Sequence, residues 1–139
     1  MALYLLDTDT LSLFRRQHPV VLRRVFTHIG DEIGITVITI EEQIAGWQKL
    51  VGHAKSLHDH ARASRYLADD ATIWAAFPIF PQTEASLARF EQLVRLKLNV
   101  GRMDLRIASI ALELGATVVT RNHRDFARVP NLSDADWTS

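Results

Sequence analysis

Four acidic residues occupy comparable positions along the chain. Asp7 directly follows an apolar run, and Glu42 lies one turn into a helical pattern that follows a β-branched run. Asp104 begins a helical pattern behind a glycine loop, and Asp125 follows the last short apolar run. The junctions that follow parallel strands lie at one edge of a sheet. We therefore expect these carboxylates to converge, although they are far apart in the sequence.

Converging carboxylates indicate a metal site. No lysine or arginine in the sequence is an evident fixed partner for all four acids, and acids that face inward are rarely left unpaired. Carboxylates and water are the preferred ligands of Mg²⁺ or Mn²⁺ rather than of zinc. Such a site can polarise a phosphodiester and activate water for its hydrolysis.

Each acid also has a simpler interpretation as a helix cap. Asp7 could cap the helix that follows it, and Thr39–Glu42 fits a capping box. Asp104 and Asp125 could each offset the dipole of their helices. Taken singly, capping is the better interpretation of every one of these acids. Only their common arrangement favours a shared site.

Helical periodicity predicts that two of the acids face inward. Asp104 shares its stripe with Ile107 and other apolar residues. Glu42 shares a face with Ala45 and Gly46, small residues that would allow another element to approach closely. These patterns favour a buried acidic site over four independent caps.

The elements that must position these acids alternate between strand and helix patterns. The predicted strands are 3–6, 33–38, 77–80 and 117–120. The predicted helices are 8–16, 20–28, 39–51, 55–76, 83–99, 103–114 and a short one at 125–128. This alternation predicts a parallel sheet covered on both faces. The two central helices mix charged and apolar residues, so residues 43–76 are expected to form a helical arm.

The composition is that of an ordinary globular protein. The 139 residues are 47% hydrophobic and 23% charged, and this length suits a single domain, 1–139. The absence of cysteine excludes disulfides and thiolate catalysis. No apolar run is long enough to span a membrane, and we expect a cytoplasmic protein with no membrane partner. The formal net charge is zero, which by itself argues mildly against a nucleic-acid binder.

Four segments in order resemble the motifs of PIN-domain proteins, specifically of VapC-type toxins. The closing Val129–Leu132 and the tail tryptophan Trp137 extend this resemblance to nearly the whole chain. Each motif alone is weak, but four in order at suitable spacing are specific. The segments are Leu5–Ser12, Ile38–Gly46, Gly101–Ala108 and Val119–Phe126.

The resemblance implies a PIN-like three-layer α/β/α sandwich with a central parallel sheet and a protruding helical arm. It implies an Mg²⁺- or Mn²⁺-dependent endoribonuclease that cleaves RNA, often tRNA or rRNA, as the toxin of a type II toxin–antitoxin pair. The implied partners are the RNA substrate, a cognate antitoxin and a second copy of the chain in a homodimer. The arm resembles the part of these toxins that dimerises and contacts the antitoxin, and the arginines near it are candidates for RNA phosphate contacts.

The resemblance also implies roles for individual residues. Asp9, Thr120 and Asn122 are expected to support the site by orienting ligands or water through hydrogen bonds. The neighbouring Glu41 leaves open which of two consecutive glutamates belongs to the site. The acids implied to bind metal and act in catalysis are Asp7, Glu42, Asp104 and Asp125.

Two other functions remain open at this point. Asp7 and Asp9 also match the opening motif of haloacid-dehalogenase-like phosphatases, as nucleophile and general acid. That function needs a lysine after a middle strand and an acidic pair in the last turn, and residues 120–125 contain no such pair. The other alternative is a non-catalytic PIN domain that only binds RNA or a partner protein.

Overall fold

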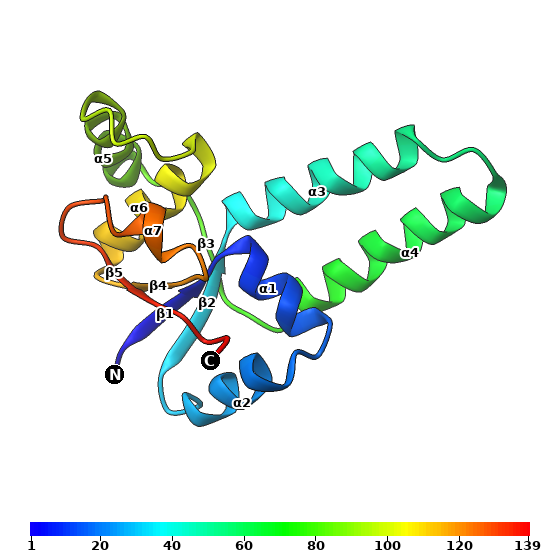
Figure 1. The fold of residues 1–139 in the computed structure, drawn as a ribbon, viewed down its shortest axis with the longest axis horizontal. Coiled ribbons are helices and arrows are strands. Elements are labelled where there is room, and N and C mark those ends of the chain that lie inside the picture. Colours follow the sequence, from blue (N-terminus) through cyan, green and yellow to red (C-terminus); the bar gives the residue numbers. More distant parts are fainter.

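The computed structural model describes residues 1–139 (Figure 1). The strands are β1 (Leu3–Leu6), β2 (Glu32–Thr36), β3 (Ile79–Phe80), β4 (Thr117–Val119) and β5 (Ser133–Ala135). The helices are α1 (Thr8–Arg15), α2 (Pro19–Thr27), α3 (Val37–Gly52), α4 (Leu57–Trp74), α5 (Glu84–Arg95), α6 (Arg102–Leu114) and α7 (His123–Phe126).

The five strands form one parallel sheet in the order β3-β2-β1-β4-β5. β1 is central, with Leu5 paired to Gly34 of β2 on one side and to Val118 of β4 on the other. Leu5 and Leu6 are both fully buried, as expected for a parallel strand covered on its two faces. The carboxyl end of β1 therefore lies in the middle of one sheet edge.

Two apolar clusters lie on the two faces of the sheet. Leu5 packs with α5, α6 and the segment around Phe126, which together form the larger cluster. Leu6 packs with Leu11 of α1 and Trp137 of the tail, joined by residues of α2 and the end of α4. Figure 1 shows these helices on opposite sides of the strands. The predicted central parallel sheet flanked by helices is confirmed.

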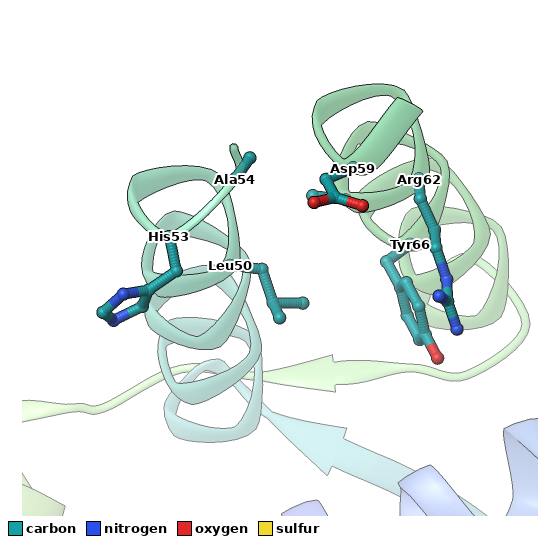
Figure 2. A pocket seen from close by; sticks show the side chains of 7 residues that line it. Leu50, His53, Ala54, Asp59, Arg62 and Tyr66 are labelled. Atoms are coloured by element: carbon teal, nitrogen blue, oxygen red, sulfur yellow. The ribbon is translucent and has the colours of Figure 1, made fainter. Parts of the chain in front are cut away.

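The predicted helical arm is also present. α3 and α4 run side by side as a hairpin that extends away from the sheet (Figure 1). Between its two helices near the tip lies a pocket of about 360 Å³, to which α3 contributes Leu50 and α4 contributes Arg62 and Tyr66 (Figure 2). No helix of the structure is both long enough and apolar enough to cross a membrane.

Several predicted boundaries are wrong. β2 ends at Thr36 and α3 begins at Val37, so the β-branched pair that continues the strand pattern is helical. Thr36 is the N-cap residue and makes no side-chain cap bond, and Thr39 lies fully buried inside the helix. The predicted capping box at Thr39–Glu42 does not exist. Burial of Ile38 against the larger apolar cluster overrides the local preference of this segment for a strand.

The second half of the chain contains two more differences. The helix predicted at 83–99 is shorter: α5 is capped by Thr83 and ends at Arg95, and Leu87 and Val94 on it are exposed. β5 was not predicted, because Ser133–Ala135 is short and carries no apolar alternation. Its strand conformation depends on pairing with β4, in which Ser133 lies opposite Thr117.

Candidate active site

Asp7 continues directly from the central strand. Its backbone N–H donates to the carbonyl of Val119 at 3.0 Å, which extends the pairing of β1 with β4 by one residue. Its Oδ1 accepts from the N–H of Thr10 at 2.8 Å, so Asp7 is also the N-cap of α1. The side chain is buried, and desolvation raises its pKa, while a hydrogen bond from the Thr120 hydroxyl opposes that rise. The acid is thereby fixed at the sheet edge by both strand and helix.

Glu42 reaches the site from the second turn of α3. Its Oε1 accepts a hydrogen bond of 2.6 Å from the hydroxyl of Thr8, the residue that follows Asp7. The Thr8 oxygen also lies 3.1 Å from the hydroxyl oxygen of Thr39. Thr8 was not predicted as a functional residue. Its position next to Asp7, at the first turn of a helix, was the only signal in the sequence.

The neighbouring Glu41 has a different role. Its carboxylate accepts two hydrogen bonds from Arg106 of α6, at 2.8 and 3.1 Å, and these hold the pKa of Glu41 below its usual value. The pair ties α3 to α6 outside the site. Of the two consecutive glutamates, Glu42 lines the acidic pocket and Glu41 does not.

Asp104 enters from the first turn of α6. It is not the cap, since Gly101 takes that position without a side-chain cap bond. Its carboxylate is half-buried, and its pKa rises to about 6, first through desolvation and then through repulsion by Asp7, Glu42 and Asp125. This repulsion means that negative charges from four separate segments act on one another at this place.

Asp125 lies at the margin of the site. It belongs to α7, where its Oδ2 accepts from the amide of Asn122 at 3.0 Å and its Oδ1 lies 3.4 Å from the Arg128 guanidinium. Asn122 lines the pocket, whereas Asp125 does not. Thr120 accepts from the Asn122 N–H at 2.8 Å. The loop after β4 thus presents a connected set of polar groups to Asp7 and Asp104.

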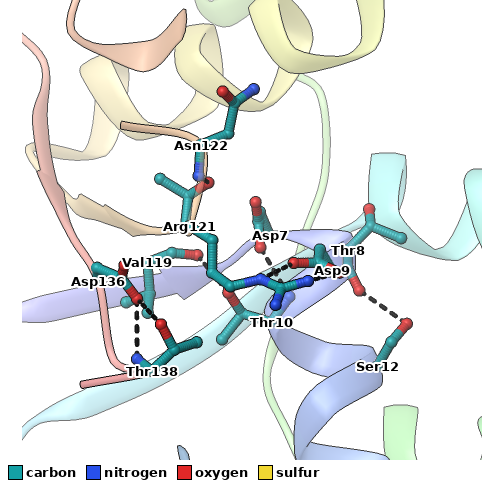
Figure 3. Close-up of polar contacts among 11 residues, drawn as sticks. Asp7, Thr8, Asp9, Thr10, Ser12, Val119, Arg121, Asn122, Asp136 and Thr138 are labelled. Atoms are coloured by element: carbon teal, nitrogen blue, oxygen red, sulfur yellow. Dashed lines mark hydrogen bonds and ion pairs between the residues drawn. The ribbon is translucent and has the colours of Figure 1, made fainter. Parts of the chain in front are cut away.

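The pocket that these residues form measures about 440 Å³ and contains no hydrophobic lining residue. Three of the four predicted acids line it directly. Asp9, predicted to orient ligands or water, forms an ion pair with Arg121 (Figure 3). The lining residues are Asp7, Thr8, Asp9, Glu42, Asp104, Arg121 and Asn122.

One predicted feature of the α3 face is wrong. Gly46 was expected to allow close approach of another element beside Glu42. A Cβ atom added at Gly46 would meet nothing within 4 Å, and both Gly46 and Ala45 are exposed. The inward position of Glu42 depends on its contact with Thr8 and not on small neighbours.

The residues of the pocket fit a divalent cation of the hard, oxygen-binding kind. Buried and half-buried carboxylates repel one another there, and this repulsion adds to desolvation in raising the pKa of Asp104. The one arginine that lines the pocket, Arg121, is paired with Asp9. No three acidic or histidine side chains already converge into a ready-made metal-binding group. Mg²⁺ commonly takes one or two carboxylates and completes its shell with water, so this looser arrangement suits it.

Comparisons with known proteins agree with this arrangement. A family model described as PIN domain matches residues 4–132. The chain is 31% identical to the tRNA(fMet)-specific endonuclease VapC of Salmonella typhimurium over 99% of both chains. It is 26% identical to Ribonuclease VapC1 of Haemophilus influenzae (strain R2866) over 98% of both chains.

A solved structure extends the likeness to three dimensions. The DNA-bound VapBC complex from Salmonella typhimurium contains a chain that superimposes with a TM-score of 0.80 at 27% identity, covering 99% of both chains. The likeness to this solved chain therefore covers the fold of the whole chain. The chain belongs to the PIN-domain family, and within it to the VapC-type proteins.

Proposed function

We propose that this VapC-type protein is an endoribonuclease, the toxin of a toxin–antitoxin pair, and that the acidic pocket is its active site. One observation carries the assignment: Asp7, Glu42 and Asp104 come from three separate elements and line one pocket without an apolar residue. Relatives along the full length of the chain are named ribonucleases, which supports hydrolysis of RNA rather than another reaction.

We further propose that the activity depends on Mg²⁺ or Mn²⁺ held, directly or through water, by Asp7, Glu42 and Asp104, with Asp125 adding negative charge at the margin. When bound, such a cation neutralises the carboxylates and activates a phosphodiester towards hydrolysis. The chain itself orients the acids. Thr8 orients Glu42 by its hydroxyl, and the Thr120 hydroxyl favours the charged form of Asp7. This effect supports the helper role proposed for Thr120.

The proposed partners are an RNA substrate, a cognate antitoxin and a second copy of the chain. The VapBC relatives are toxin complexes, which supports an antitoxin partner. The arm offers exposed apolar side chains, including Leu50, Leu57 and Tyr66, on which a protein partner can pack. The relative from Salmonella typhimurium is named for tRNA(fMet), and we therefore propose tRNA as the first substrate class to examine.

The phosphatase alternative finds no support in the site. No lysine lines the pocket, and the loop after β4 contributes an amide and a guanidinium rather than an acidic pair. A protein of that kind would hydrolyse a small phosphomonoester, which the nuclease proposed here would leave intact.

The test uses the purified chain and a tRNA pool, with Mg²⁺ or with EDTA. Cleavage is expected only with Mg²⁺, and Asp7→Asn is expected to lower its rate by at least about a hundredfold, since metal charge supplies several kcal/mol to such reactions. Glu91→Gln provides a matched control, because Glu91 is an exposed carboxylate of α5 with no partner. If Asp7→Asn cleaves as fast as the parent, the pocket is not the active site. Sequencing the new RNA ends identifies the substrate.

A further inference from the structure

One basic residue lines the acidic pocket. Among its seven lining residues, Arg121 is the only one with a positive charge. Arg121 directly follows Thr120 in the loop after β4, and it reaches across the rim to Asp9 of α1 (Figure 3). A pocket of carboxylates repels a polyanion such as RNA, and a positively charged side chain at its mouth offsets this repulsion.

The guanidinium is held in a fixed orientation. Its Nε donates to Asp9 Oδ2 at 2.7 Å and its Nη2 donates to Asp9 Oδ1 at 3.1 Å, which is the bidentate geometry that arginine forms with carboxylates. A guanidinium has five N–H donors. Two of them are used on Asp9, so three remain for another acceptor. The hydrogen bonds and charge of Asp9 raise the pKa of Arg121, with smaller contributions from the charges of Asp136 and Asp7, so it stays charged.

The ion pair has little value as a structural element. Both side chains are about half exposed, at 51% for Arg121 and 50% for Asp9. Exposed ion pairs contribute little to folding, because water screens the attraction and two long side chains must be ordered. The position of the pair at the rim of the pocket is better explained by contact with a ligand that enters the pocket from solvent.

On the basis of the ribonuclease activity proposed above, we propose that Arg121 binds a phosphate of the RNA backbone at the mouth of the pocket. Asp9 holds the guanidinium in place through Nε and one Nη2 donor, and the remaining donors face the phosphate. Bidentate recognition of phosphate is a common use of arginine. Asp9 is accordingly a positioning residue for Arg121 and not a metal ligand.

The experiment measures binding of a fluorescein-labelled, mixed-sequence single-stranded RNA in EDTA, by anisotropy over a range of salt concentrations. Cleavage does not interfere under these conditions. Arg121→Ala is expected to weaken binding about tenfold at low salt, as loss of a hydrogen bond to a charged group does. The slope of log K against log salt should fall by about 0.7, the value for one phosphate contact on a single strand. Arg121→Lys should keep the slope but not the full affinity.

Two further variants separate phosphate binding from a structural ion pair. Asp9→Asn removes the ion pair but keeps the charge of Arg121, so the salt slope should stay at the value of the parent and the affinity should fall by less than in Arg121→Ala. Arg89→Ala removes an exposed α5 arginine outside the pocket and should leave both nearly unchanged. Equal losses in Arg121→Ala and Asp9→Asn would overturn the inference, as would parental binding by Arg121→Ala. Failure of the parent chain to bind this RNA in EDTA would overturn the inference, whereas the cleavage assay with Mg²⁺ tests the proposed function separately.

Discussion

Replacing Asp104 by asparagine is expected to stabilise the metal-free protein at neutral pH while it removes nuclease activity. The carboxylate is half-buried and repelled by Asp7, Glu42 and Asp125, which raises its pKa to about 6. In the unfolded chain the pKa returns to about 3.8. At neutral pH the folded state therefore carries a charge that its surroundings disfavour, and a neutral amide of nearly the same shape relieves it.

The expected gain in the free energy of unfolding can be calculated from these pKa values. The difference between 3.8 and about 6 corresponds to about 3 kcal/mol at full weight, and solvent screening at a half-exposed carboxylate reduces this to about 1.5 kcal/mol. Loss of an acid from the first turn of α6 costs about 0.5 kcal/mol through the helix dipole. The net gain is about 1 kcal/mol, or about 3–5 °C in Tm for a chain of this length.

The pH dependence has a definite sign. A raised pKa in the folded state contributes stability that is fully present below about pH 4 and is lost as pH rises through about 6. The advantage of Asp104→Asn should therefore be absent at about pH 4, grow through about pH 5 and be complete by about pH 7.5. Thermal unfolding in EDTA at these pH values measures the difference in Tm between Asp104→Asn and the parent.

Addition of Mg²⁺ or Mn²⁺ should reverse the order of the Tm values of the parent and Asp104→Asn. A cation bound only by the folded state stabilises it by about 2.7 kcal/mol at a hundred times its Kd. The parent should gain Tm with added metal, and Asp104→Asn should gain little. Glu91→Gln is the control for loss of a negative charge. A lower Tm for Asp104→Asn in EDTA at neutral pH, with Glu91→Gln unchanged, would refute the repulsion that we infer at the site.

Two further predictions concern the elements around the pocket. Gly34→Ala should destabilise the chain by about 1–3 kcal/mol in urea unfolding, because its Cβ would lie 2.5 Å from Phe80 Cε2, whereas Gly30→Ala, with nothing within 4 Å, should not. Thr8→Val should lower the cleavage rate by about 10–100-fold with little change in Tm, because it removes the hydroxyl that orients Glu42. A rate equal to that of the parent would show that this hydrogen bond has no catalytic role.

The features that could be predicted from sequence are those fixed by local pattern. Apolar periodicity predicts the strand before Asp7 and the hairpin arm. Gly115, whose φ of 64° suits glycine, predicts the end of α6. The boundary between β2 and α3 could not be predicted, because Val37 and Ile38 continue a β-branched run. Only tertiary burial makes these two residues helical.

The finer details of the site depend on contacts between distant residues. Glu41 and Glu42 are equivalent in the sequence, and the difference between them is set by Arg106, which is 65 residues away. The partner of Asp9 is 112 residues away. No local pattern encodes such pairs, so the sequence predicted the acids, three of which line the pocket, and not the groups that orient them.

Asp7 shows why helix capping and metal binding need not be alternatives. Its Oδ1 caps α1 while the carboxylate lines the pocket, and the cap fixes the orientation in which the charge is presented. Asparagine is as good an N-cap as aspartate. Asp7→Asn therefore keeps the cap and removes the charge, whereas Asp7→Ala removes both. If Asp7→Asn has a Tm in EDTA at least as high as that of the parent and loses cleavage, the loss reports on the charge of Asp7 and not on the folding of α1.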